Sequence, residues 1–465
     1  MDSRQIRFSL IALGIVVPVA VFIFISYLLI GSFAKANIRV DAQKNLGPLK
    51  TPWRAIAQGG EQSGVRMLQP VTSQLRSLFP EYIRIDHLYD FYNVVSRGPG
   101  GLSYDWTQLD QTVCDIYASG AKPFFALGYM PGSISSDGSV VSPPSNWDDW
   151  RQVVQKTIER YSGQSTILCG GTIKGDSLTN IYYEVWNEPD LESFGKWSVY
   201  GGAKSYMNLY EQSVRGAQNA QSVQKFYIGG PSTTAPYRNW MRTFLDVATQ
   251  RNLRVDFISW HRYSQSVDTY ADDMKNINDW MPAETYSQYR DLPKIITEWG
   301  FDPAYNPVAD GPAGAAHIVG SVRNFLDGNI AYAFTFEAHD GDHPSHGILA
   351  QDGTRRARFE ALKLLNLLEG DRVGVDGESN YVKAIAAKKD STIRVILANY
   401  DPEGKHGEQV PLSFSGLEPG TYQLSVTNIG YSKLKFDTVT LNGEDLQRVI
   451  YMSPNHVSVV EITKI

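Results

Sequence analysis

Short apolar runs recur along residues 53–336, and each is followed by a stretch whose apolar residues have helical spacing. The runs are rich in β-branched and aromatic residues, as buried strands are, and there are eight of them: Trp53–Gln58, Tyr82–Ile85, Pro123–Gly128, Ile181–Trp186, Phe226–Gly229, Val255–Trp260, Lys294–Thr297 and Ile330–Phe336. Parallel strands need crossover connections, and eight strands close at a diameter that side chains can fill. The pattern therefore predicts a (β/α)8 TIM barrel of the α/β class over residues 53–370.

The segments between these runs predict the helices of the barrel. The clearest are Trp147–Tyr161, Ala203–Ala220 and Ala313–Leu326, in which apolar residues follow helical spacing. An open, doubly wound sheet is the alternative architecture. It is disfavoured because no Gly-rich phosphate loop follows the first run, where Gly59 and Gly60 alone are a weak signal.

The rhythm changes after the helix-like segment Arg355–Leu368. Residues now alternate between apolar and polar in short runs that Gly, Asp, Asn and Pro turns separate: Tyr381–Ala387, Thr392–Asn399, Gln409–Phe414, Thr421–Thr427, Leu434–Leu441 and His456–Thr463. This pattern predicts a C-terminal antiparallel β-sandwich over residues 371–465. Residues 37–52 are expected to be a linker, within which Asn37–Asp41 is a candidate strand of the same sandwich.

The N-terminal segment carries no charge over a long stretch. Phe8–Ala34 spans 27 residues without a charged side chain, more than the roughly 20 needed to cross a bilayer. We therefore expect residues 1–36 to form a cytoplasmic tip and an N-terminal transmembrane helix, with residues 8–34 in the lipid bilayer. Ala34-Lys35-Ala36 resembles a signal-peptidase site, so cleavage of the segment is the alternative.

The expected location follows from this segment. A single-pass anchor in the inner (cytoplasmic) membrane would hold the large domain in the periplasm or outside the cell, whereas cleavage would release it by secretion. Basic residues flank the span on both sides, Arg4 and Arg7 before it and Lys35, Arg39 and Lys44 after it. Their distribution does not fix the orientation, so export rests on what the large domain does.

Charge and cysteine content exclude two classes of protein. The net charge is -6 and the pI is near 5.8, and Lys and Arg are scattered, so no nucleic-acid partner is expected. Cys114 and Cys169 are too few for a disulfide framework or a zinc knot. One bridge between them is possible, but two unpaired buried thiols are the expectation.

Polar side chains gather at the ends of the predicted barrel strands, which is where such barrels place their chemistry. These positions are Arg84, Asp86, Tyr129, Asn187, Glu188, His261, Tyr263, Glu298, Trp299, Glu337, His339 and Asp340. Glu188 follows the fourth run and Glu298 follows the seventh, so the two carboxyl groups are expected to face each other across the mouth. The others are expected to contact the ligand or to brace the barrel.

Two facing glutamates indicate hydrolysis of a glycosidic bond. A separation of about 5 to 5.5 Å would let Glu298 attack the anomeric carbon while Glu188 protonates the leaving oxygen, which is the retaining mechanism. Arg84 could hold Glu298 ionised, while a drier environment keeps Glu188 protonated. Asn187 is expected to bond the sugar 2-hydroxyl. We assign Glu188 and Glu298 as catalytic.

Further substrate-binding candidates are the polar and aromatic residues at neighbouring strand ends: Arg84, Asp86, Tyr129, Asn187, His261, Tyr263, Trp299 and Glu337. Arg84 could instead only brace the barrel, and His261 could be a structural histidine. Three of the eight histidines fall in residues 339–346, which invites a metal interpretation. Two carboxylates hydrolyse glycosides without a metal, and a polar loop beside a sugar site explains the same histidines, so neither metal nor cofactor is expected.

A long series of motifs resembles glycoside hydrolase family 39, whose retaining enzymes include β-xylosidases, α-L-iduronidases and bacterial endoglycosidases of biofilm exopolysaccharides. The matching stretches are Trp53, Gly59-Gly60, Tyr82-Ile83-Arg84, Lys122–Pro131, Glu184–Pro189, Gly229-Gly230-Pro231, Val255–His261, Ile296–Trp299 and Gly347-Ile348-Leu349. The resemblance implies that Glu188 is the acid/base, Glu298 the nucleophile and His261 the histidine of the sixth strand. It also implies a trailing β-sandwich.

Two departures bear on the substrate. Family xylosidases tend to have histidine where this chain has Asp86, and tryptophan where it has Phe334. With the expected anchor, the departures favour an endo-acting enzyme of a bacterial exopolysaccharide, which could associate with a polysaccharide synthesis or export complex. The alternatives are an exo-acting, xylosidase-like β-glycosidase and a non-catalytic carbohydrate-binding subunit of an export machine. Every reading has a polysaccharide or oligosaccharide as partner.

Overall fold

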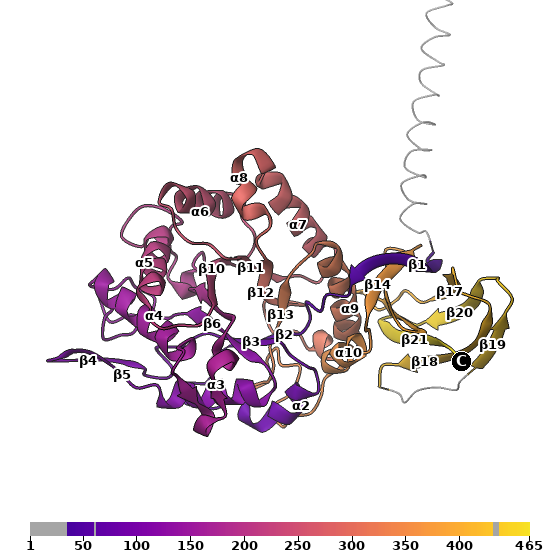
Figure 1. The fold of residues 1–465 in the computed structure, drawn as a ribbon, viewed down its shortest axis with the longest axis horizontal. Helices are drawn as coiled ribbons and strands as arrows, with labels where there is room; N and C mark the ends of the chain where they lie inside the picture. Colours follow the sequence, from indigo (N-terminus) through magenta and orange to yellow (C-terminus); the bar gives the residue numbers. More distant parts are fainter. Residues whose placement is uncertain (1–34, 60–61, 431–436) are drawn as a thin grey trace, which may run out of the picture. The chain divides into compact units, whose positions relative to one another are not determined.

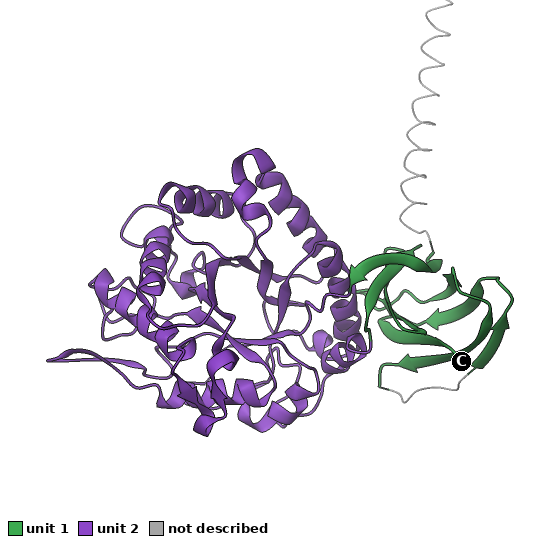
Figure 2. Cartoon of the chain, in the orientation of Figure 1, with its two compact units in different colours: residues 1–48, 368–465 green, residues 49–367 purple. Residues whose placement is uncertain are grey.

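The computed structural model describes residues 35–59, 62–430 and 437–465, which form two compact units. One unit is Leu49–Leu367, and the other combines residues up to Pro48 with Leu368–Ile465 (Figure 2). The expected membrane anchor, residues 8–34, lies outside the described residues. Within the described ranges, no helix combines the length and the apolar character that crossing a bilayer requires.

Eight parallel strands close into a barrel in the first unit. In chain order they are β2 (Ala55–Gln58), β3 (Tyr82–Ile85), β6 (Lys122–Leu127), β9 (Ile181–Val185), β10 (Phe226–Thr233), β11 (Ile258–Tyr263), β12 (Lys294–Gly300) and β13 (Tyr332–Phe336). Around the barrel, β2, β3, β6 and β9 to β13 follow one another in sequence, and β13 pairs with β2. Each predicted run overlaps one of these strands, so the predicted eight-stranded α/β barrel is confirmed.

Helices surround the barrel (Figure 1). They are α2 (Thr72–Arg76), α3 (Thr107–Ala118), α4 (Trp147–Tyr161), α5 (Tyr206–Asn219), α6 (Arg238–Gln250), α7 (Thr269–Trp280), α8 (Ala283–Arg290), α9 (Pro312–Asp327) and α10 (Ala357–Leu365). The predicted helix at Trp147–Tyr161 is α4 itself. The Asn146 side chain caps it by accepting from the Asp148 amide, and Trp150, Val153 and Ile158 lie on its buried face.

Loops of the barrel unit contain smaller elements. They are the hairpins β4 (Val95–Gly98) with β5 (Gly101–Tyr104) and β7 (Ile167–Leu168) with β8 (Ile173–Lys174), and the 3-10 turns η1 (Gln69–Val71), η2 (Cys169–Gly171), η3 (Gly175–Leu178), η4 (Glu192–Phe194) and η5 (Pro307–Asp310). The second hairpin carries η2 against α3. The barrel floor is apolar and holds Phe334 beside Phe124, with 4.8 Å between the ring centroids.

The two cysteines form a disulfide, so the expectation of two unpaired thiols is wrong. Cys114 lies on α3 and Cys169 on η2, and their Cα atoms are 5.5 Å apart. The bond depends on the fold of the β7–β8 hairpin, because the cysteines are 55 residues apart in sequence. That sequence separation gave no indication of their proximity.

The second unit is one nine-stranded sheet. Its strands are β1 (Ile38–Pro48), β14 (Asp371–Asp376), β15 (Val382–Lys389), β16 (Thr392–Asn399), β17 (Glu408–Ser415), β18 (Gly420–Asn428), β19 (Asp437–Leu441), β20 (Leu446–Met452) and β21 (His456–Lys464). Their order is β19, β18, β21, β16, β15, β14, β1, β17, β20. The β-rich character of the C-terminal region is as predicted. The sheet is mixed rather than purely antiparallel, because β1 pairs in parallel with β17.

Candidate active site

Arg84 on β3 binds three side chains at the mouth of the barrel. Its Nε donates to Glu184 Oε2 at 2.9 Å, its Nη1 to Glu298 Oε1 at 2.7 Å, and its Nη2 to Asn187 Oδ1 at 2.8 Å. The side chain is 1% exposed. Burial alone would lower the pKa of Arg84, but Glu184, Glu298 and Asp86 outweigh it and raise that pKa. The guanidinium therefore stays charged. It holds the side chains of Glu184 on β9, of Asn187 just after β9 and of Glu298 on β12 in place.

His261 on β11 lies between the two candidate catalytic glutamates. Its Nδ1 is 2.9 Å from Glu188 Oε1 and 3.4 Å from Glu298 Oε2, while its Nε2 is 3.2 Å from Ser232 Oγ. Burial lowers the pKa of His261, but Glu298 and the hydrogen bond to Glu188 outweigh that effect and raise it. One ring nitrogen of His261 thus contacts both carboxyl groups, and the hydrogen bond of the other nitrogen to Ser232 fixes the orientation of the ring.

The carboxyl groups of Glu188 and Glu298 are close enough for direct nucleophilic attack. One oxygen of each, together with a nitrogen of His261, forms a group whose atoms all lie within 4.8 Å of one another. Inverting enzymes instead leave about 6.5–9.5 Å for a water molecule. The backbone N–H of Glu188 also donates to the Ser232 carbonyl at 2.9 Å, and Glu188 has a φ of 41°. The site thus commits this residue to an uncommon backbone conformation.

Glu298 receives a donor on each oxygen. Besides Arg84 on Oε1, Tyr263 Oη donates to Oε2 at 3.0 Å. Burial raises the pKa of Glu298, and the lowering effects of His261 and Arg84 oppose the rise without cancelling it. The ion pair with Arg84 expected from the sequence is present. Its effect on the pKa is smaller than that of burial, which the sequence could not weigh.

Three more predicted residues join this network. Asn187 Nδ2 donates to Tyr129 Oη at 2.8 Å, which uses one of its two N–H groups. Asp86 is 7% exposed, and its negative charge raises the pKa of Tyr129 and of Arg84. Together with His261 and Tyr263, these side chains lie in one network with the glutamate pair, and their contact with substrate stays a prediction.

Trp299 and Glu337 are not joined to the glutamate pair by any hydrogen bond in the described structure. Trp299 is fully buried against Tyr270 on α7 and Phe325 on α9, so the expectation that it contacts a sugar is corrected. Adjacent strand residues point to opposite faces, and Glu298 takes the inner one. Glu337 is also fully buried, and neither carboxyl oxygen has a hydrogen-bond partner among the described residues.

Three residues of the site were not predicted from the sequence: Glu184, Ser232 and His87. Glu184 is fully buried and accepts from Arg84. It lies two residues after Tyr182 on β9, so both side chains point to the same face, and this period of two was a usable signal. Ser232 was missed because β10 continues past the predicted end of its run at Gly229. His87 Nε2 lies 4.0 Å from Asp86 Oδ2 and its Nδ1 2.7 Å from Asp90 Oδ2. Burial lowers its pKa, but Asp86 and Asp90 outweigh burial and raise it.

The histidine-rich loop and Phe334 have other roles than those considered from the sequence. His339 bonds the carbonyls of Met67 and Gln351, and Asp340 pairs with Arg356. Phe334 lies in the apolar barrel floor rather than in a sugar subsite, which corrects that expectation. In the described ranges, one set of three acidic or histidine groups is close enough to hold a metal: Glu188, His261 and Glu298. The hydrogen bond of His261 to Glu188 and its ion pair with Glu298 account for that proximity.

Known proteins share this fold and up to about a quarter of the aligned residues. The family described as Glycosyl hydrolases family 39 matches residues 36–429. A β-xylosidase of Caldicellulosiruptor saccharolyticus is 25% identical over 407 residues, covering 78% of this chain and 79% of the relative. A β-xylosidase of Geobacillus stearothermophilus is 24% identical over 353 residues, covering 68% and 66%.

Solved structures agree on the fold. A monomeric β-xylosidase from Caulobacter crescentus CB15 superimposes with a TM-score of 0.74 at 21% identity, covering 92% of this chain and all of that one. A GH39 enzyme from Xanthomonas axonopodis pv. citri gives 0.74 at 19% identity, with 93% and 98% covered. With the family match spanning most of the sequence, the chain belongs to glycosyl hydrolases family 39 and is a retaining glycosidase.

Proposed function

We propose that the chain is an exo-acting β-glycosidase of xylosidase type, which releases single sugar units with retention of configuration. The observation that carries the proposal is the Glu188 and Glu298 pair, whose oxygens lie within 4.8 Å of each other. The substrate class rests on the two curated relatives, both of which are β-xylosidases. The exo mode is part of the proposal and follows those relatives.

The reaction has two steps at the anomeric carbon. In the first, Glu298 attacks that carbon and the glycosidic C–O bond breaks, while Glu188 gives its proton to the departing oxygen. In the second, Glu188 takes a proton from water, whose oxygen attacks the same carbon and displaces the Glu298 carboxylate. The proton that Glu188 gives up in the first step is replaced by the one that it takes from water in the second. The sugar leaves with its original anomeric configuration.

The surrounding network prepares Glu298 for attack. Arg84 and Tyr263 hold its two oxygens, so the carboxylate has one orientation before the sugar arrives. His261 lies next to both glutamates, so it can stabilise the negative charge on Glu298 before the first step and on Glu188 after it. The second N–H of Asn187 is available for the sugar 2-hydroxyl, a contact that strengthens in an oxocarbenium-like transition state. Tyr129 orients that amide, and Asp86 adds negative charge beside it.

Endo cleavage of a bacterial exopolysaccharide is the second candidate, because exposed tyrosines follow several barrel strands. Tyr200, Tyr237 and Tyr305 are 53%, 43% and 39% exposed, and they follow β9, β10 and β12. Flat aromatic rings stack on the apolar faces of pyranoses, so these residues offer contacts for further units of a polymer. Association with a synthesis or export complex remains a prediction of this candidate.

We also propose that the catalytic unit works outside the cytoplasm, in the periplasm or beyond the cell. The disulfide between Cys114 and Cys169 supports this location, because such bonds persist in oxidising compartments and are rare in reducing ones. A single-pass anchor at residues 8–34 remains part of the proposal, and signal cleavage with secretion is its alternative.

The first prediction concerns products. Wild-type enzyme acting on xylohexaose should give xylose and xylopentaose as the only early products, and proton NMR of the released xylose should show the β anomer. Glu188→Gln and Glu298→Gln should each lower kcat by about 10³-fold or more, because each removes an obligatory group. Internal fragments before xylose would favour the endo candidate. Wild-type turnover no faster than that of either variant, on xylans and bacterial exopolysaccharides alike, would contradict the hydrolytic assignment.

The second prediction tests the Arg84 fork. Arg84→Lys keeps the charge but cannot reproduce three directed hydrogen bonds, so kcat/KM should fall by about 10²-fold. Arg262→Lys is the matched control, because Arg262 pairs with Asp273 on α7 outside the network. Steady-state kinetics of both variants on 4-nitrophenyl β-xyloside decide the matter. Equal losses in the two would show that Arg84 only braces the barrel.

The third prediction concerns pH. Glu298 must lose its proton to attack, and burial raises its pKa, so the acidic limb of kcat/KM should lie above the ordinary glutamate value of about 4.3. His261 lowers the Glu298 pKa, so His261→Ala should move that limb to higher pH. The control His343→Asn changes an exposed histidine and should leave the limb in place. A limb that moves to lower pH in His261→Ala would refute the assignment.

The fourth prediction concerns location. In cells that produce the protein natively, an alkylating reagent should label neither Cys114 nor Cys169 until a reductant is added, as mass spectrometry of the tryptic peptides will report. Detection of peptides from residues 8–34 in the membrane fraction would support the anchor over cleavage. Thiols alkylated before reduction would place the domain in a reducing compartment and overturn the proposal.

A further inference from the structure

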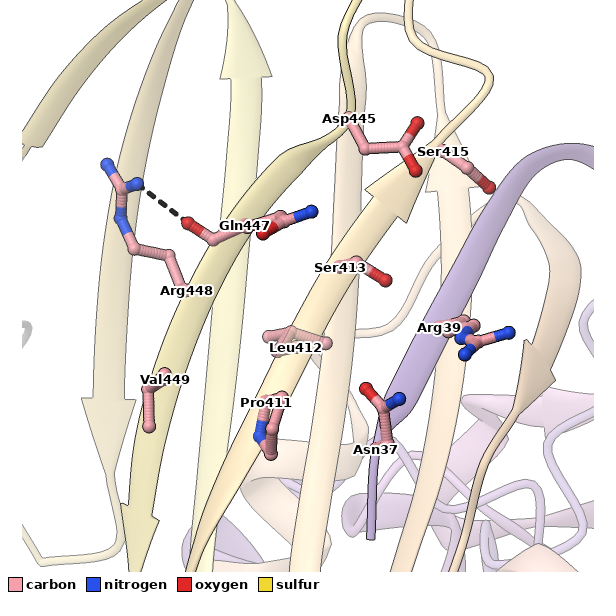
Figure 3. Close-up of a pocket in the computed structure, with 10 residues that line it drawn as sticks. All are labelled: Asn37, Arg39, Pro411, Leu412, Ser413, Ser415, Asp445, Gln447, Arg448 and Val449. Atoms are coloured by element: carbon pink, nitrogen blue, oxygen red, sulfur yellow. Dashed lines mark hydrogen bonds between the residues drawn. The ribbon is translucent and has the colours of Figure 1, made fainter.

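The sheet of the second unit has a hollow on its outer surface, far along the sequence from the catalytic glutamates. It has a volume of about 750 Å³ and lies over β1, β17 and β20 (Figure 3). Volumes of this size are typical of sites for small ligands. Most of its lining is polar and comes from outward-facing strand positions, so the hollow is a feature of the surface rather than a defect of the core.

Strand register sets the lining in rows. Arg39 on β1 pairs with Ser413 on β17, which in turn pairs with Gln447 on β20, so these polar side chains form one row across three strands. The next row on the same face has Pro411 opposite Val449, and both are exposed. Beside the polar row thus lies an apolar step, which Pro411 and Val449 form. Figure 3 shows Asp445, Gln447 and Ser413 turned toward the side of Arg39, with Arg448 turned away.

The polar side chains of the hollow divide into two groups. Ser413 and Ser415 donate to backbone carbonyls of β1, and Arg448 pairs with Asp437, so these are used within the protein. Among the described residues, the side chains of Arg39, Asp445 and Gln447 have no hydrogen-bond or ion-pair partner. Charges elsewhere on the same sheet are paired, as Arg394 is with Glu461 and Lys464 with Glu418. A guanidinium, a carboxylate and an amide therefore face one hollow with their bonding capacity free.

We propose that this hollow is a second carbohydrate-binding site, which takes a neutral glycan chain. A pyranose has an apolar face that fits the Pro411 and Val449 step, and vicinal hydroxyls that planar Arg, Asp and Gln groups can bond in pairs. Arg39 and Asp445 carry opposite charges, and Arg448 is turned away and paired with Asp437, so the hollow has little net charge. This disfavours a polyanion, and the polar majority of the lining disfavours an apolar protein surface. The inference rests on the proposed function in taking a glycan as the ligand.

The site would hold substrate chains near the enzyme without taking part in bond cleavage. Binding through a second module raises the local concentration of the chain ends on which the glutamates act. The advantage should therefore appear with polymers and vanish with a small aryl glycoside. The two sites can be separated by experiment.

The test uses the full chain carrying Glu188→Gln and Glu298→Gln, probed on an array of neutral oligosaccharides that includes xylohexaose. In this background, Arg39→Ala and Gln447→Ala should each weaken binding to the recognised glycans about tenfold. Arg39→Lys should also weaken it, because an ammonium lacks the paired donors. Gln423→Ala on β18 is the matched control and should bind as the parent does. Arg39 and Gln447 are exposed and Gln423 is half-buried, and unchanged circular dichroism will confirm folding.

Two results would overturn the site: no array glycan bound by the inactivated chain, or binding that Arg39→Ala and Gln447→Ala leave unchanged. Hydrolysis is measured separately, with the glutamates intact. There, Arg39→Ala should leave kcat/KM on 4-nitrophenyl β-xyloside unchanged while lowering the rate on a polymer. Absence of hydrolysis in the wild type would refute the proposed function alone, because array binding does not depend on turnover.

Discussion

The site depends on one buried ion cluster, in which Arg84 binds Glu184, Glu298 and Asn187. A buried guanidinium is unfavourable unless its donors are satisfied, and a buried carboxylate is unfavourable without a counter-charge. Each therefore requires the others. Because Arg84, Glu184 and Glu298 come from β3, β9 and β12, the cluster forms only when the barrel has closed in register. The chemistry of the mouth and the closure of the barrel thus stabilise each other.

Glu184 adds a second buried carboxylate beside Arg84. Arg84 faces two carboxylates and the nearby Asp86, so its single charge is exceeded by the acids around it. His261 adds a group that can become positive next to Glu188 and Glu298. During the reaction the negative charge moves from Glu298 to Glu188, and an imidazole that contacts both can follow it with little movement. The cluster is therefore suited to two successive steps rather than to one fixed charge state.

The barrel and the central pair were predictable from the sequence because they obey strand periodicity. Apolar runs ending in polar residues place Glu188 and Glu298 at one rim, whatever the loops do. The prediction that Trp299 contacts the sugar was wrong because Trp299 directly follows Glu298 on the strand, and adjacent strand residues point to opposite faces. Ser232 was not predicted because the predicted run ended at Gly229, within a Gly-Gly-Pro segment, whereas the strand continues to Thr233. The Cys114–Cys169 bond depends on a loop conformation, which periodicity does not report.

The sheet of the second unit shows where local pattern is least informative. β20 alternates in its burial, but its outward positions include Val449 and Tyr451, 60% and 65% exposed, so the alternation of apolar and polar residues is lost. β1 sits between β14 and β17, whose residues follow the whole barrel in sequence. This strand cannot pair until the chain beyond Leu368 has been made, so the sheet must form after barrel synthesis. Pairing of β1 with strands that come much later in the sequence joins the two ends of the described chain in one unit. Only the assembled sheet creates the row of Arg39, Ser413 and Gln447.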